Sequence, residues 1–217
     1  MSRPIRYLPL LEQLDRWQAD ARTRHPGVIP CRTGCSACCH GPFDISIADV
    51  ALIAEAVALL PADVRTEVVE RARSQVAAMQ AIEPQWAAPF DIGAIGEARF
   101  DRVSDELAEL PCPMLDQAGA CLIYHDRPMI CRLMGLGLVT ERGDVIENGC
   151  PIQERFPAYE RLEPQPFPLE AWESDEDEAR ADAAIRLGDA GLLDYETTIA
   201  AAVVSGLTPG PRYPGNR

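Results

Sequence analysis

The segment CRTGCSACCH, residues 31–40, constrains this sequence most, because it places four cysteines and a histidine within ten residues. The chain has 217 residues and eight cysteines in all. They are Cys31, Cys35, Cys38, Cys39, Cys112, Cys121, Cys131 and Cys150. Eight cysteines could form four disulfides in a secreted protein, whereas a reducing cytosol favours metal binding or catalysis. We predict that all eight are metal ligands, with disulfides and unrelated buried thiols as the alternatives.

The N-terminal sequence indicates the compartment of the protein, and its net charge indicates which partners it binds. The apolar run at residues 7–11 is short, contains Pro9 and is followed by charges at Glu12 and Asp15, unlike the apolar core of a secretory signal. No stretch approaches the roughly 18 apolar residues of a membrane helix. The formal net charge of −14 argues against nucleic acid or an anionic membrane as a partner. The sequence therefore predicts a cytoplasmic protein with no nucleic-acid and no membrane partner.

The spacing of the cysteines divides them into two groups. The first group has the pattern C-x3-C-x2-C-C. In the second, eight residues separate Cys112 from Cys121, nine separate Cys121 from Cys131, and eighteen precede Cys150. Zinc accepts four thiolates at about 2.3 Å, and an iron–sulfur cluster also takes about four. Soft thiolate ligands suit both metals, so the spacing leaves open zinc and an iron–sulfur cluster, with [4Fe–4S] as the favoured cluster type.

The adjacent pair Cys38 and Cys39 limits the geometry of the site. Successive side chains of an extended segment point to opposite sides, so the two thiols would serve one zinc ion poorly. They could bind different irons of one cluster or face two separate sites. Alternatively, one is a ligand and the other a packed or redox-active thiol. Eight thiols are enough for two four-cysteine sites, but one cluster with spare cysteines fits as well.

Charged and imidazole side chains accompany the cysteines. Arg32, Arg127 and Arg132 lie close to cysteines in sequence, and their guanidinium groups would offset the negative charge of a thiolate site. His40 and His125 are candidates to replace a cysteine ligand, although a position outside the ligand set is favoured for both.

Apolar periodicity predicts a mainly α fold of the α+β class, with helical hairpins around a cysteine-rich metal knot and small β hairpins. Ser46 is the expected N-cap of the second helix, with Asp49 three residues on as an acidic variant of the capping box. The expected helices cover residues 5–23, 47–60, 61–81, 100–110, 126–135, 179–190 and 194–206. The expected hairpins cover residues 112–124 and 136–150.

Three segments are expected along the chain. Residues 1–29 form an N-terminal helix, residues 30–152 form a cysteine-rich zinc- or iron-chelating domain, and residues 153–217 contain a proline-rich acidic linker, closing helices and a frayed tail at 208–217. The acidic run ESDEDE, residues 173–178, is interpreted as a solvated linker or a helix start.

The cysteine pattern resembles that of a known family. CRTGCSACC is followed by CPML and then by CLIYHDRPMICR, and Cys150 precedes Pro151. This combination is similar to the CxxCxxCC family of zinc- or iron-chelating domains over about residues 30–152, with three residues rather than two between Cys31 and Cys35. The resemblance implies metal binding without naming a reaction. One branch is similar to flagellin lysine methylases, in which the domain is associated with an iron–sulfur centre and methyl transfer.

Three functions are consistent with the sequence. The leading hypothesis is a small metalloprotein with an iron–sulfur cluster or zinc, used for redox or electron-transfer work. The second is a structural-zinc module that binds a protein partner. The third is a metal-dependent modifying enzyme such as a protein methyltransferase, with Tyr124, Asp126 and Arg127 as the nearby polar groups to test, although packing against the knot is favoured for Tyr124 and Arg127. Whether the protein is an enzyme stays open, and no G-x-G-x-x-G or H-E-x-x-H motif is present.

Overall fold

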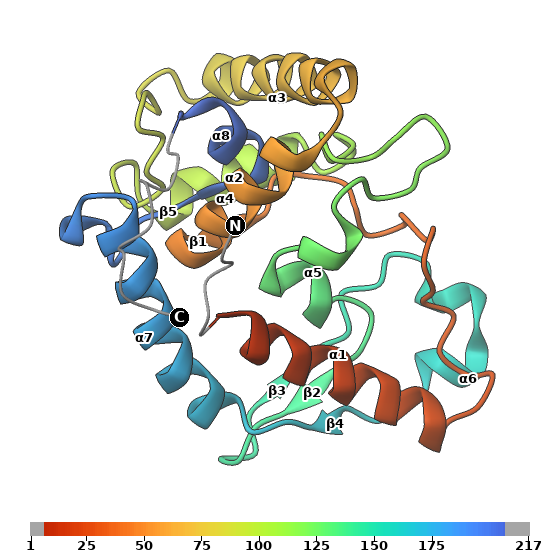
Figure 1. The fold of residues 1–217 in the computed structure, drawn as a ribbon. Coiled ribbons are helices and arrows are strands. Elements are labelled where there is room, and N and C mark those ends of the chain that lie inside the picture. Colours follow the sequence, from red (N-terminus) through yellow and green to blue (C-terminus); the bar gives the residue numbers. More distant parts are fainter. Residues whose placement is uncertain (1–6, 207–217) are drawn as a thin grey trace.

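The computed structural model describes residues 7–206, in which short strands are embedded among helices (Figure 1). The helices are α1 (Tyr7–Arg24), α2 (Ile47–Leu59), α3 (Ala62–Ile82), α4 (Glu97–Glu106), α5 (Met129–Leu133), α6 (Pro157–Glu160), α7 (Leu169–Arg186) and α8 (Ile199–Val204). The strands are β1 (Asp44–Ser46), β2 (Leu138–Val139), β3 (Val145–Ile146), β4 (Gln165–Pro166) and β5 (Glu196–Thr198). This arrangement confirms the predicted mainly α fold with small β elements.

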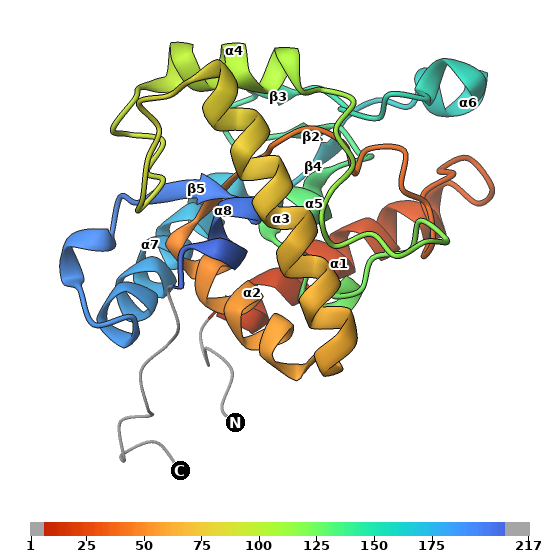
Figure 2. The ribbon, with the colours of Figure 1, turned by 90° about the horizontal axis from the view of Figure 1, so that it is seen from above.

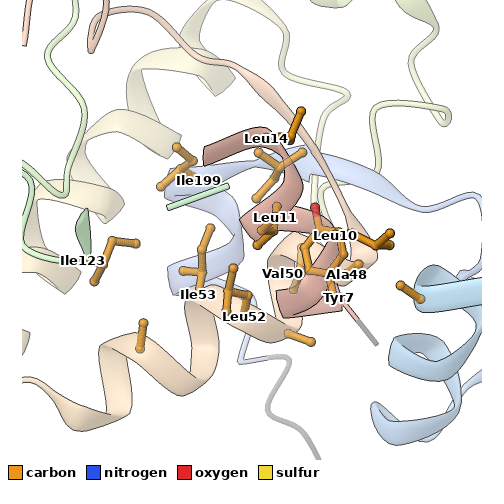
Figure 3. Close-up of a cluster of buried hydrophobic side chains, with 14 of the residues drawn as sticks. Tyr7, Leu10, Leu11, Leu14, Ala48, Val50, Leu52, Ile53, Ile123 and Ile199 are labelled. Carbon is orange, nitrogen blue, oxygen red and sulfur yellow. The ribbon is translucent and has the colours of Figure 1, made fainter. Parts of the chain in front are cut away.

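The larger core forms where α1 packs onto α2, α7 and α8. Leu10, Leu14 and Trp17 recur at helical spacing along α1 and are buried, as expected for an amphipathic helix. Figure 3 shows side chains of α1 and α2 converging in this core, together with Ile123 and Ile199. The last two also line a cavity that contains the cysteines. The hydrophobic core therefore forms part of the wall of that cavity.

A smaller core lies beneath α3. Val76 and Met79 of α3 are buried with Phe100 and Val103 of α4 and with Ala201 of α8. Figure 2 shows α3 crossing in front of α8. The predicted helical hairpin of residues 47–81 is present as α2 and α3, and Leu60 and Pro61 separate the two helices.

The strands form two small sheets. One is the antiparallel pair of β1 and β5, in which Asp44 is opposite Thr198. The other has the order β3-β2-β4, with an antiparallel β2–β3 hairpin and a parallel β2–β4 pair. The β2–β3 hairpin lies within the range predicted at 136–150, whereas the range 112–124 contains only the isolated bridge between Leu115 and Cys121. The pairing of β1 with β5 joins segments about 150 residues apart and was not predicted.

The C-terminal helices differ from the prediction. Helix α7 begins at Leu169, ten residues before the expected start. The acidic run therefore lies inside a helix, which agrees with the helix-start interpretation and not with the linker. Trp172, Glu176, Ala179 and Ala183 form its buried stripe. Because one member of that stripe is a carboxylate, the apolar periodicity is broken in the sequence. The expected helix at 194–206 is also shorter, since its first part is strand β5 and only Ile199–Val204 are helical.

Two other observations complete the description of the fold. Ser46 occupies the N-cap position of α2, but its hydroxyl makes no capping hydrogen bond. Within residues 7–206, no helix combines the length and the apolar composition needed to cross a lipid bilayer. The first two residues of the expected helix 5–23 and the expected tail at 208–217 lie outside the described residues.

Candidate metal centre

Seven of the eight cysteines line one cavity. They are Cys31, Cys35, Cys38, Cys39, Cys112, Cys121 and Cys131. The cavity has a volume of about 100 Å³. This is room for more than one water molecule, since a single water occupies about 30 Å³ of the liquid. The tertiary structure therefore assembles thiols from two distant segments of the chain around a common space.

The N-terminal cysteine segment is folded into two consecutive turns. The backbone N–H of Cys35 donates to the carbonyl oxygen of Arg32, and that of Cys39 donates to Ser36, both over 2.9 Å. Gly34 has a φ of +87°, a left-handed value that favours glycine. The expectation that adjacent thiols point in opposite directions is wrong, because residues 36–39 form a turn and are not extended. Cys38 and Cys39 both line the cavity, and their thiols interact with each other.

Backbone pairing attaches the second cysteine segment to the first. The N–H of Cys112 donates to the carbonyl oxygen of Cys39 over 2.8 Å. An isolated antiparallel bridge pairs His40 with Pro111, and a second bridge pairs Leu115 with Cys121. These contacts bring Cys112 and Cys121 to the same cavity as Cys38 and Cys39.

Helix α5 supplies Cys131, and a buried carboxylate holds the start of this helix. The backbone N–H of Met129 donates to Oδ1 of Asp49 over 3.1 Å, and the hydroxyl of Tyr7 donates to the same oxygen over 2.7 Å. The side chain of Asp49 is 1% exposed. Burial raises the pKa of Asp49 to about 6. Asp49 thus connects α1 and α2 to the first residue of α5, two positions before Cys131.

Cys31 and Cys150 form a second group around Tyr159. Cys150 is buried and does not line the cavity. The sulfur of Cys31 lies 3.8 Å from the hydroxyl oxygen of Tyr159, which donates to the carbonyl oxygen of Gly135 over 2.6 Å. Burial raises the pKa of Cys31, and the charges that Cys150, Cys35 and Cys38 would carry raise it further, so these thiols lie within electrostatic range of Cys31. The structure therefore places Cys150 beside Cys31, at the edge of the cysteine set.

Burial keeps most of the cavity thiols protonated. It raises the pKa of Cys112 to about 12 and also raises the pKa values of Cys31, Cys121 and Cys131. The hydrogen bond with the Cys39 thiol, followed by burial, raises the pKa of Cys38 far above its usual range. A metal binds thiolates, so loading this site must displace protons.

Two arginines form the electropositive side of the cavity. Arg127 and Arg132 both pair with Asp15, and the Arg127–Asp15 distance is 2.9 Å. The Arg127 guanidinium lies 4.3 Å from the centre of the Tyr124 ring. Its charge opposes the effect of burial on the pKa values of Cys38 and Cys121. Arg127 is therefore placed to stabilise thiolates, as the sequence suggested.

The cysteines share a cavity, but the described side chains do not form a ready-made single-ion site. Within residues 7–206, no three side chains among cysteine, histidine, aspartate and glutamate converge closely enough to hold a single metal ion. The thiols surround a space instead of meeting at one point. Thiolates are ligands both for zinc and for iron–sulfur clusters, so this donor set is consistent with either metal group.

Other side chains around the cavity were not predicted. Gln18 and Arg22 of α1 line the cavity, although they precede the first cysteine by several residues. Tyr159 reaches Cys31 from 128 positions along the chain. No local pattern in the sequence indicates these contacts. Among the described residues that line the cavity, the two histidine candidates His40 and His125 are not present.

Comparison with known proteins identifies the family. No curated protein and no solved structure matches the chain. The sequence model of one family matches residues 30–151, which is more than half of the chain and contains all eight cysteines. The chain therefore belongs to the CxxCxxCC family, described as "putative zinc- or iron-chelating domain".

Proposed function

We propose that this protein is a redox or electron-transfer protein whose cysteines hold an iron–sulfur cluster of the [4Fe–4S] type. The observation that carries this proposal is the arrangement of seven thiols around one cavity. A structural zinc site draws four thiolates to about 2.3 Å from one point. A cubane cluster instead needs ligands spread around a larger body, with about one thiolate for each iron.

Cys38, Cys112, Cys121 and Cys131 are the four ligands that we propose for the cluster. Burial raises the pKa of Cys131, and the charges of Cys112, Asp49, Cys121 and Cys38 raise it further, so we take Cys131 as the central thiol of the proposed four. Three of these four also lie in segments connected by direct backbone pairing. The remaining four, Cys31, Cys35, Cys39 and Cys150, lie outside this set and would be the spare cysteines, or the ligands of a second site, that the sequence left open.

The surroundings of the site support a redox role. The seven cavity cysteines are only partly buried, so a cluster there would lie near the surface, within reach of a protein partner. Hydrogen bonds, nearby charge and solvent exposure tune the potential of such clusters. Here Arg127, held by Asp15 and Tyr124, would supply a fixed positive charge. The cluster would supply the electron, and the chain would set its potential.

The test is to quantify iron, zinc and acid-labile sulfide in protein purified without oxygen. We expect about four irons and four sulfides per chain, with broad visible absorption that bleaches on reduction. A colourless protein with stoichiometric zinc and no sulfide would refute the cluster.

A structural zinc site is the second candidate, because the cysteines come from segments that a metal would cross-link. Residues 31–39, residues 112–131 and Cys150 are far apart in sequence, and closing such loops stabilises a fold. In that case a chelator would remove zinc and unfold the domain cooperatively. Unchanged melting of the metal-free protein would exclude this structural role.

A further inference from the structure

Two arginines at the cysteine cavity differ from Arg127 and Arg132 in lacking a carboxylate partner. Arg22 and Arg32 line the same cavity as the seven thiols. No aspartate or glutamate within residues 7–206 forms an ion pair with either of them. This is notable in a chain with 34 acidic residues and 20 basic ones. The two guanidinium groups therefore carry charges that no carboxylate of the described residues balances through an ion pair.

Arg22 is held in place by a buried glutamine. Its Nη2 donates to Oε1 of Gln18 over 3.1 Å. Gln18 is 4% exposed, and its amide donates to the carbonyl oxygens of Arg132 and Met134, over 3.1 and 3.3 Å. The position of Arg22 is thus fixed relative to the end of α5, the helix that carries Cys131.

The Nε atom of Arg22 is buried and has no hydrogen-bond partner among the described residues. A buried donor without a partner is costly, and a charged one more so. An acceptor that reached Nε after a local movement of the neighbouring side chains would remove this cost. The guanidinium fork presents Nε and one Nη side by side, a geometry that matches the two oxygens of a carboxylate or phosphate group.

Arg32 supplies a second cation from the exposed loop between Cys31 and Cys35. Its contact within the described chain is a long hydrogen bond, 3.5 Å, to the carbonyl oxygen of Pro30. The side chain is therefore weakly held and can reorient toward a ligand at the rim of the cavity.

From these observations we propose that Arg22 and Arg32 form an oxyanion-binding subsite beside the cysteines, which receives the carboxylate or phosphate group of a small molecule. The metal centre would share this cavity, so the subsite would lie at its rim, on the side of the exposed Arg32. The ligand would lie next to the metal centre. The inference goes beyond the proposed redox role and holds whether the metal is iron or zinc.

Charge balance with the thiolates is the competing explanation for these arginines. Arg127 already acts on Cys38 and Cys121, and Arg71 acts on Cys112. The net charge of −14 also repels anions at long range, so an anion that binds here must be held by local contacts. Saturable binding of an anion that depends on these two arginines would therefore identify the subsite.

The experiment is calorimetric titration of malonate and of inorganic phosphate into the purified protein with its native metal content. We expect saturable binding of malonate, of phosphate or of both. The anion with the higher affinity identifies whether the subsite recognises a carboxylate or a phosphate group. Arg22→Gln should weaken binding at least about tenfold, and Arg22→Gln/Arg32→Gln should abolish it. The matched control is Arg16→Gln, an exposed arginine of the same helix that pairs with Glu12 outside the cavity.

Metal content is measured for every variant. If the double glutamine variant loses metal, the comparison moves to Arg22→Lys/Arg32→Lys, which keeps both charges but removes the planar fork. Absence of saturable binding to the wild-type protein overturns the proposal, and so does unchanged affinity in the double variant that retains metal. A zinc protein without sulfide that still binds the anion would refute the cluster and leave the subsite intact.

Discussion

The backbone N–H of Cys112 donates a hydrogen bond to the carbonyl oxygen of Cys39 over 2.8 Å. This contact joins two cysteine segments that are separated by more than seventy residues and by helices α2, α3 and α4. Because it involves only backbone atoms, it leaves the thiols of both residues available as metal ligands. The backbone therefore holds the two segments side by side without using a thiol.

Replacing Cys131 should remove more metal than replacing Cys150. Cys131→Ser deletes the central thiol of the proposed four, so we expect loss of most of the bound metal. Cys150→Ser should retain most of it, since Cys150 lies outside the cavity. Metal and sulfide per chain are measured, with circular dichroism to verify folding. Greater loss in Cys150→Ser than in Cys131→Ser would contradict the assignment of the four ligands.

Gly135→Ala should disturb Cys31. A Cβ atom at Gly135 would lie 2.5 Å from the Cys31 sulfur, and the residue has a φ of +87°. We expect a loss of about 2–4 kcal/mol in the free energy of unfolding, from backbone strain and the steric clash together.

Gly143→Ala is the matched control for this substitution. Gly143 has a φ of +88° and no atom within 4 Å of the added Cβ, so it reports the backbone strain alone, about 1–2 kcal/mol. Urea unfolding measures both variants. Equal losses in the free energy of unfolding for the two variants would show that the contact with Cys31 does not contribute to stability.

Asp15→Asn should destabilise the protein through its arginine partners. Asp15 pairs with both Arg127 and Arg132, and the Arg132 side chain is 2% exposed. Leaving a buried cation without its anion costs up to about 3–5 kcal/mol of stability. Asp15 itself is 42% exposed, so solvent screens part of this interaction. We therefore expect a loss of about 1–3 kcal/mol in the free energy of unfolding. Glu12→Gln breaks an exposed pair with Arg16 and should cost less than about 0.5 kcal/mol. Chemical denaturation compares the two, and equal costs would contradict the role of Asp15.

Glu176 should make the stability fall with rising pH. Burial, followed by the charge of Asp49, raises the pKa of Glu176 from 4.5 to about 7. The folded protein holds this proton more tightly than the unfolded chain does. The resulting contribution to stability is fully present below about pH 4.5 and is lost as the pH rises through about 7. Glu176→Gln should reduce this fall, and it should raise the free energy of unfolding at pH 8 by an amount on the order of 2 kcal/mol.

The pH dependence is measured by urea unfolding between pH 5 and pH 8. Glu173→Gln, an exposed position of the same helix, serves as the control and should leave the curve unchanged. An identical pH dependence in wild type and Glu176→Gln would show that Glu176 titrates normally.

The spacing of apolar residues was enough to predict the longer helices. It could not predict contacts between segments that are far apart in the sequence. Helices α1, α2 and α3 have apolar residues at helical spacing, and their predicted bounds agree with the structure to within a few residues where it describes them. The start of α7 was missed because Glu176 occupies its buried stripe. Strand β5 was predicted as helix because its partner, β1, is about 150 residues away and leaves no local signal.

The sequence by itself determined the class of site: eight cysteines, their spacing and the match of residues 30–151 to a zinc- or iron-chelating family follow from the order of residues alone. Only the tertiary structure decided how those cysteines are divided. It turned Cys38 and Cys39 toward the same cavity, placed Cys150 outside it beside Cys31, and added Arg22 from the first helix. The physical reason is that side-chain direction depends on turns and on packing between distant segments, which residue spacing does not encode.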